Sequence, residues 1–146
     1  MPDQPIQITK YDDTRHRTAT IALWQQVFGY EAAHNEPGKV IDMKLAHDDG
    51  LFFVAQEDDK DGLVMGTVMA GYDGHRGWIY SIAVSPGRRK QGLGSKLLEH
   101  AVAELRKRGC EKVNLQIMGD NAAVKAFYEK NGFLVEERVS MGLVTC

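Results

Sequence analysis

The 146-residue sequence contains only two cysteines, Cys110 and Cys146, and no CxxC pair. A disulfide scaffold needs more cysteines, and a structural zinc site needs closely paired ligands, so the sequence excludes both. No apolar stretch approaches the roughly 18–20 residues that a membrane-spanning helix needs. Neither sign of charge dominates, because 18 basic side chains stand against 20 acidic ones. This balance argues against a protein that coats nucleic acid through bulk electrostatics.

The composition is that of a globular protein, with 43% hydrophobic and 26% charged residues. These fractions lie near the averages of about 45–50% and about 25%. The length fits one hydrophobic core, which usually serves about 100–150 residues. Residues 1–5 are polar and lack the basic and apolar regions of a signal peptide. We therefore expect a single domain spanning 1–146 that is soluble and cytoplasmic and binds neither membranes nor nucleic acid.

The order of apolar patterns predicts a mixed sheet with helices on both faces. Period-two alternation predicts strands, and the stripe of apolar residues between 93 and 105 predicts the strongest helix. The expected strands are 6–11, 51–55, 63–72, 78–84, 112–117, 133–136 and 139–144. The expected helices are about 15–28, about 40–47, 93–105 and 121–130, with polar turns at 58–62 and 73–77. The predicted fold class is therefore α/β, with about seven strands and about four helices.

The segment 84–95 connects a predicted strand to the strongest predicted helix through a basic, glycine-rich loop. Free backbone N–H groups at a helix start bind phosphate, and Gly92 and Gly94 allow the close approach that a side chain would block. The loop is not a Walker motif, because Leu93 and Gly94 follow its second glycine. It is not a dinucleotide fingerprint either, because Leu97 stands at the third glycine position. A glycine-rich turn without a ligand is the alternative interpretation.

Two motifs resemble those of the GNAT family of N-acetyltransferases. Arg89-Lys90-Gln91-Gly92-Leu93-Gly94 is similar to the Arg/Gln-x-x-Gly-x-Gly/Ala motif of the family. The segment 121–133 is similar to the Asn-x6-Tyr-x3-Gly-Phe signature, and 66–77 further resembles the YpeA-like bacterial group. The resemblance covers about 51–133. It implies the GNAT fold and an acetyl-CoA-dependent N-acetyltransferase.

The resemblance also implies a role for each matching residue. The pyrophosphate of acetyl-CoA would bind the backbone of Lys90, Gln91, Gly92, Leu93, Gly94 and Ser95. The pantetheine arm would pair with Ile82, Ala83 and Val84, and an amide near Ile82 or Ala83 would hold the thioester carbonyl. Asn121 would contact the pantetheine or act only as a helix N-cap. Tyr128 would be the catalytic general acid for the leaving thiolate, and a core tyrosine is the alternative.

The general base is the part that the resemblance does not supply. Ribosomal-protein N-terminal acetyltransferases have a glutamate where this sequence has Gln116, and histone-type relatives have one where Trp78 stands. A glutamine cannot act as a base near neutral pH. The remaining candidates are Glu57, Asp73, His75 and a water held by Tyr72 or Tyr80. No metal-ligand spacing links the histidines, so we expect no metal.

The resemblance implies transfer of an acetyl group to a primary amine by direct attack in a ternary complex. The acceptor would be a small-molecule amine or a peptide amine, bound against the side formed by the first two helices and the turn at 73–77. A homodimer is compatible with the resemblance. Because both glutamates are missing, the alternative is a non-catalytic acetyl-CoA-binding sensor or a module that binds a partner.

Overall fold

The computed structural model describes residues 6–29, 35–57 and 63–145. The chain divides into two compact units, 1–115 and 116–146. The predicted turn at 58–62 lies outside the described residues.

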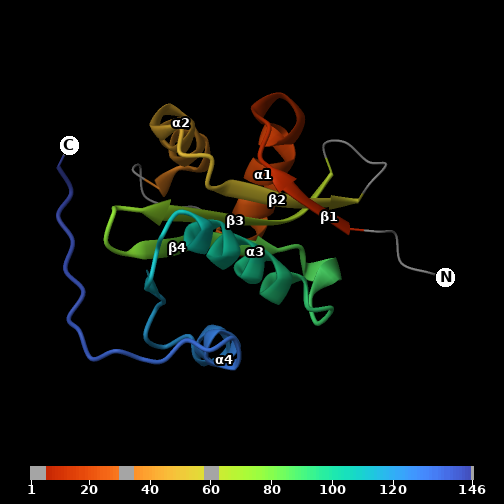
Figure 1. Ribbon diagram of the computed structural model, residues 1–146. Coiled ribbons are helices and arrows are strands. Elements are labelled where there is room, and N and C mark those ends of the chain that lie inside the picture. The colour runs from red at the N-terminus through yellow and green to blue at the C-terminus, as the bar shows by residue number, and fades with distance from the viewer. Residues whose placement is uncertain (1–5, 30–34, 58–62, 146) are drawn as a thin grey trace. The chain divides into compact units, whose positions relative to one another are not determined.

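The first unit contains a five-stranded mixed sheet (Figure 1). Its strands are β1 (Ile6–Lys10), β2 (Phe52–Glu57), β3 (Val64–Tyr72), β4 (Gly77–Val84) and β5 (Val113–Leu115). The order across the sheet is the order along the chain. The first four strands pair antiparallel, whereas β4 and β5 pair parallel and are joined through a helix. Parallel crossovers of this kind are right-handed, so the connecting helix packs against one face of the sheet.

Helices cover both faces of this sheet: α1 (Asp13–Phe28) and α2 (Pro37–His47) lie on one face, and α3 (Leu93–Lys107) lies on the other (Figure 1). Two of them start at a side-chain cap. Asp12 accepts a hydrogen bond from the N–H of Arg15, and Glu36 accepts from the N–H groups of Gly38 and Lys39. Such caps satisfy backbone donors that the helix itself leaves unpaired.

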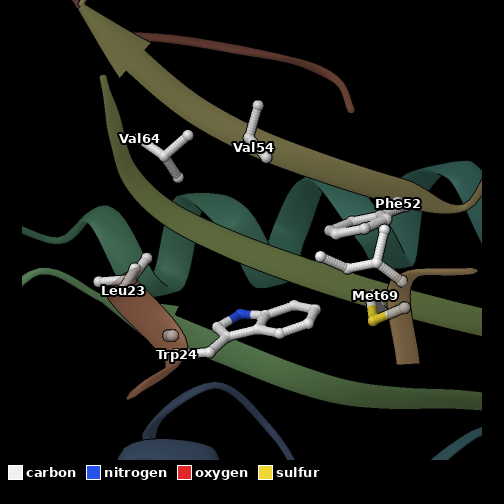
Figure 2. Packing of buried hydrophobic residues seen from close by; sticks show 8 residues of the cluster. Leu23, Trp24, Phe52, Val54, Val64 and Met69 are labelled. Carbon is white, nitrogen blue, oxygen red and sulfur yellow. The ribbon is translucent and has the colours of Figure 1, made fainter. Parts of the chain in front are cut away.

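The core on the α1 side is built around Trp24, which lies among side chains of β2 and β3 (Figure 2). Its ring stacks on Phe52 with the centroids 5.8 Å apart, and both belong to one buried cluster with Val54, Val64 and Met69. All of these side chains are buried. The helix is therefore fixed against the middle of the sheet.

On the opposite face, glycines let α3 approach the strands closely. A Cβ atom at Gly66 would lie 2.8 Å from Leu97 Cδ1 and 2.9 Å from the carbonyl oxygen of Ala83. A Cβ atom at Gly77 would lie 3.0 Å from Leu105 Cδ1 of α3 and 2.7 Å from Cys110 Sγ, just after the helix. Real side chains do not pack this tightly, so the sheet needs glycine at both positions to keep α3 in place.

The second unit contains α4 (Ala122–Lys130). Asn121 caps this helix, since its Oδ1 accepts a hydrogen bond from the N–H of Val124 at 3.2 Å. Tyr128 is buried, and its ring makes edge contacts with Phe127 and Phe133.

The α/β class with a mixed sheet is confirmed, and the number of strands in the described residues is five rather than about seven. The segments 133–136 and 139–144 form no strand, and β5 is shorter than the predicted 112–117. Alternation makes a segment suitable for a strand, but a strand exists only where a neighbour pairs with its backbone. Within the second unit, no neighbouring strand pairs with the backbone of 133–145.

Candidate functional site

A β-bulge interrupts β4 in its second half. Met69 is opposite Tyr80 and Thr67 is opposite Ala83, so the stretch between them has one residue more on β4 than on β3. Ser81 lies in this extra stretch and has a φ of 52°, in the left-handed region that favours glycine. The bulge therefore turns the direction of the backbone just before Ile82.

Beyond the bulge, β4 and β5 do not pair. Their ladder runs from Gly77 opposite Val113 to Ile79 opposite Leu115, and it ends there. Within the described sheet, the stretch 80–84 pairs with β3 alone. Backbone groups on the far edge of this stretch can therefore accept an extended ligand as an additional strand. The predicted pantetheine residues Ile82, Ala83 and Val84 all lie in this stretch.

The glycine-rich loop follows directly. A short 3-10 turn, Pro86–Arg88, leads to Lys90 and Gly92, whose φ values of 65° and 78° are both in the left-handed region. Gly92 is the N-cap of α3, and no side chain caps this helix, in contrast to α1, α2 and α4. The first N–H groups of α3 are thus left for an anion.

The positions of the loop residues fit backbone recognition. Leu93 is buried against the core, so only its main chain can meet a ligand, whereas Lys90, Gln91 and Gly92 are exposed. A Cβ atom at Gly92 would meet nothing within 4 Å. The loop therefore faces open space where a pyrophosphate could lie, and its residues fit the group that the motif implies.

Arg88 belongs to the basic run but faces the protein. Its guanidinium pairs with the carboxylate of Glu57, which is buried at the end of β2. This ion pair anchors the start of the loop to the sheet. It also engages the Glu57 carboxylate, which is therefore a poor candidate for the general base. Arg89 and Lys90 are the exposed cations of the loop.

The other predicted bases lie at or near the turn after β3. Asp73 accepts hydrogen bonds from the N–H groups of Arg76 and His75, and these bonds hold the pKa of its carboxyl below the usual range. Asp73 therefore closes the turn. His75 is exposed in the same turn, and the hydroxyl of Tyr72 donates to the carbonyl of Gly74 at 3.2 Å.

In the second unit, Tyr128 lies in α4, two turns after the N-cap Asn121. The capping bond uses Oδ1 of Asn121 and leaves its Nδ2 group outside that bond. Burial raises the pKa of the Tyr128 hydroxyl to about 12, so this group keeps its proton at neutral pH. Gln116, at the position of the missing glutamate, donates a hydrogen bond from Nε2 to Ser140 Oγ at 2.7 Å.

The structure thus brings the predicted cofactor residues together in two groups. The first unit joins 82–84 and 90–95 at the end of one strand and the start of the next helix, and the second carries Asn121 and Tyr128. Sequence reasoning missed Thr67, a buried polar residue within the apolar run of β3 that contacts the bulge. The sequence does contain a signal for it, since Thr67 is a polar residue within an otherwise apolar run.

The described residues contain no group of three or more histidine, cysteine, aspartate or glutamate side chains that could hold a metal ion. Among the helices that the structure describes, none has the length and apolar character needed to cross a membrane.

Comparison with known proteins agrees with this geometry. The sequence pattern of the acetyltransferase (GNAT) family matches residues 14–133. An acetyltransferase of Sodalis glossinidius is 37% identical over 134 residues, which cover 92% of this chain and 89% of the relative. An aminoglycoside N-acetyltransferase solved with CoA is similar in structure, with a TM-score of 0.77 at 18% identity. The match covers 99% of this chain and 98% of the other chain.

A ribosomal-protein alanine N-acetyltransferase of Escherichia coli has a TM-score of 0.68 at 26% identity, over 88% of this chain and 77% of its own. The chain therefore belongs to the acetyltransferase (GNAT) family. It has the GNAT fold and is an acetyl-CoA-dependent N-acetyltransferase, as the sequence motifs predict.

Proposed function

We propose that this enzyme moves an acetyl group from acetyl-CoA to a primary amine by direct attack in a ternary complex, and that residues 1–146 act as one domain. The observation that carries the proposal is the unpaired edge of β4 over 80–84, next to the uncapped start of α3. The family pattern spans both compact units. The two solved relatives described above are, by name, acetyltransferases of amine substrates, which supports an amine as the acceptor.

The residues of the first unit bind and orient. The N–H groups of 90–95 and the start of the α3 dipole hold the pyrophosphate, and Arg89 adds positive charge at the rim. The edge of 82–84 pairs with the pantetheine arm. Acetyl-CoA supplies the acetyl group as a thioester, whose carbonyl oxygen gains negative charge during the transfer. A backbone N–H of β4 donates a hydrogen bond to that oxygen.

The residues of the second unit act on the pantetheine and the leaving group. Asn121 keeps its capping bond through Oδ1 and donates to the pantetheine through Nδ2. Tyr128 stabilises the leaving sulfur. Burial raises the pKa of Tyr128 to about 12, so Tyr128 carries its proton at neutral pH. It acts as the general acid, which donates a proton or a hydrogen bond to the leaving thiolate.

Thermal unfolding with acetyl-CoA, with NADH and ATP as controls, tests the binding part. A ligand at a hundred times its dissociation constant stabilises by about 2.7 kcal/mol. For a domain of this size, this corresponds to a rise in Tm of roughly 3–6 °C. A rise with acetyl-CoA alone supports the proposal. No rise at millimolar acetyl-CoA contradicts it.

A screen of amines that follows the release of free thiol tests the transfer. The panel contains an aminoglycoside, a polyamine, free lysine and a peptide with a free N-terminus. Tyr128→Phe should retain the acetyl-CoA-dependent rise in Tm and lose at least tenfold in kcat, because a hydrogen bond to a charged group is removed. Wild-type kcat in Tyr128→Phe would overturn the role of Tyr128.

A further inference from the structure

We infer that Thr67 and Trp24 are positioning residues for acetyl transfer, which hold the β4 bulge so that the N–H of Ile82 points toward the thioester carbonyl. The inference rests on the proposed function and assigns its oxyanion-stabilising donor to one amide. It starts from a chain of three groups: the indole of Trp24, the hydroxyl of Thr67 and the backbone carbonyl of Ser81.

The hydrogen bonds in this chain have only one possible direction. Trp24 Nε1 lies 2.8 Å from Thr67 Oγ1, and Thr67 Oγ1 lies 2.9 Å from the carbonyl oxygen of Ser81. An indole N–H can only donate and a carbonyl can only accept, so the single hydroxyl proton of Thr67 goes to Ser81. Thr67 is fully buried and Trp24 nearly so. Water cannot replace either partner at this site.

The carbonyl of Ser81 belongs to the same peptide group as the N–H of Ile82. That peptide bond is trans, since the described backbone contains no cis bond, and its six atoms lie close to one plane. The C=O and the N–H of a trans peptide point in opposite directions. Because the Ser81 oxygen points toward Thr67 on β3, the Ile82 N–H points away from β3, toward the edge where β5 no longer pairs.

The conformation of Ser81 needs such a restraint. A serine with φ of 52° occupies a region that residues with a side chain rarely adopt, and it persists only where neighbouring groups hold it. The α1 face provides the restraint, because Trp24 is fixed in the core by Phe52 and Met69 (Figure 2). The orientation of a β4 amide is therefore set by a side chain of α1 through β3.

The test compares variants that change the hydroxyl and keep the volume. Thr67→Val removes the donor to Ser81, and Thr67→Ser restores it. Thr20→Val is the matched control, because Thr20 is also fully buried and no hydrogen-bond partner of its hydroxyl is found among the described residues. The measurements are kcat and KM for acetyl-CoA, with the amine that the thiol-release screen identifies, and the amide NMR signal of Ile82 without ligand and with acetyl-CoA.

We expect Thr67→Val to lower kcat at least tenfold while KM for acetyl-CoA changes less than threefold, because the pyrophosphate site is untouched. Thr67→Ser should recover most of the loss, and Thr20→Val should stay within twofold of the wild type. The unliganded Ile82 signal should shift in Thr67→Val and not in Thr20→Val. Should Thr67→Val fail to fold, Trp24→Phe removes the indole donor that directs the Thr67 proton to Ser81, and it should show a smaller Ile82 shift and a smaller selective fall in kcat.

Unchanged kcat and an unchanged Ile82 signal in Thr67→Val would overturn the inference, as would equal losses in Thr67→Val and Thr20→Val. Failure of the proposed function looks different. In that case the wild type itself shows no response of the Ile82 signal to acetyl-CoA and no thiol release, whatever the state of Thr67.

Discussion

The ammonium group of Lys44 donates a hydrogen bond to the hydroxyl of Tyr80 across 3.0 Å and thereby joins α2 to β4 one residue before the bulge. The same nitrogen donates to Asp49 Oδ2 at 2.8 Å and to the carbonyl oxygen of Ala70. All three donors of the ammonium are used, and the Lys44 side chain is only 5% exposed. The contact is an anchor of the fold.

Removing the carboxylate from this anchor should be costly. Asp49→Ala leaves a buried ammonium without its counter-charge, and such changes typically cost about 3–5 kcal/mol of unfolding free energy. Lys39→Met, on the exposed part of the same helix, should stay within about 0.5 kcal/mol of the wild type. Urea unfolding measures both. Equal midpoints for the two variants would show that the pair contributes nothing.

The same carboxylate should make stability depend on pH in acid. Burial by itself raises the pKa of Asp49, but hydrogen bonds from Lys44 and from the N–H of Leu51 outweigh it, so the pKa lies below the usual value. A depressed folded-state pKa contributes stability that is present above the unfolded value of about 3.9 and is lost as the pH falls through the folded value. Between pH 6 and pH 3, Asp49→Asn should therefore lose less unfolding free energy than the wild type.

The left-handed conformation of Ser81 predicts an unusual order of substitutions. Ser81→Gly should stay within about 1 kcal/mol of the wild type, because the relief of backbone strain offsets the entropy that glycine gains in the unfolded chain. Ser81→Val should be destabilised by about 2 kcal/mol or more, because a β-branched residue is a severe outlier in this region. Thermal unfolding of the two variants measures this order. In an ordinary strand, valine would be preferred to glycine.

The close approach of α3 to β3 should make Gly66 intolerant of a methyl group. Gly66→Ala places a carbon 2.9 Å from the backbone oxygen of Ala83, which cannot move without shifting β4. Overpacking of this kind costs about 1–3 kcal/mol. Gly119→Ala, where a Cβ would meet nothing within 4 Å, is the matched control. If both variants unfold at the wild-type urea concentration, the helix has more freedom than this packing implies.

The raised pKa of Tyr128 has a consequence for activity as well as for stability. Since its folded-state pKa is about 12, above the unfolded value of about 10, its contribution to stability is complete below pH 10 and is lost as the pH rises through 12. Deprotonation of Tyr128 should therefore cause no fall in kcat between pH 7 and pH 10. A descending limb in that range that disappears in Tyr128→Phe would contradict this.

Sequence reasoning reached the strands and helices of the first unit because each has a clear period or cap. Leu93, Leu97 and Leu105 recur at helical spacing and indeed form the buried face of α3. The segment 133–144 shows the limit of the method. Its alternation is real, but pairing is a property of two strands, and one segment does not encode where its partner lies.

The site was predicted unevenly for a similar reason. Glycines at a helix start carry a local signal, so the sequence predicts a turn before the helix, and the structure has α3 begin after Gly92. The role of 90–95 in binding the cofactor stays a prediction. Two contacts that hold the site are long-range: Arg88, in the turn after β4, reaches Glu57 on β2, and Thr67 on β3 reaches Ser81 on β4. The opposed charges and the buried hydroxyl were visible in the sequence, but their partners were not.

The order of strands in the sheet also bears on how the protein folds. β2, β3 and β4 form an antiparallel meander of sequence neighbours. In contrast, two helices separate β1 from β2 along the chain, and α3 separates β4 from β5. Contacts between sequence neighbours close short loops and form early, and distant ones form late. We therefore expect β4, with its bulge, to form early in folding together with β2 and β3. β5, which pairs with β4 only before the bulge, should join the sheet afterwards.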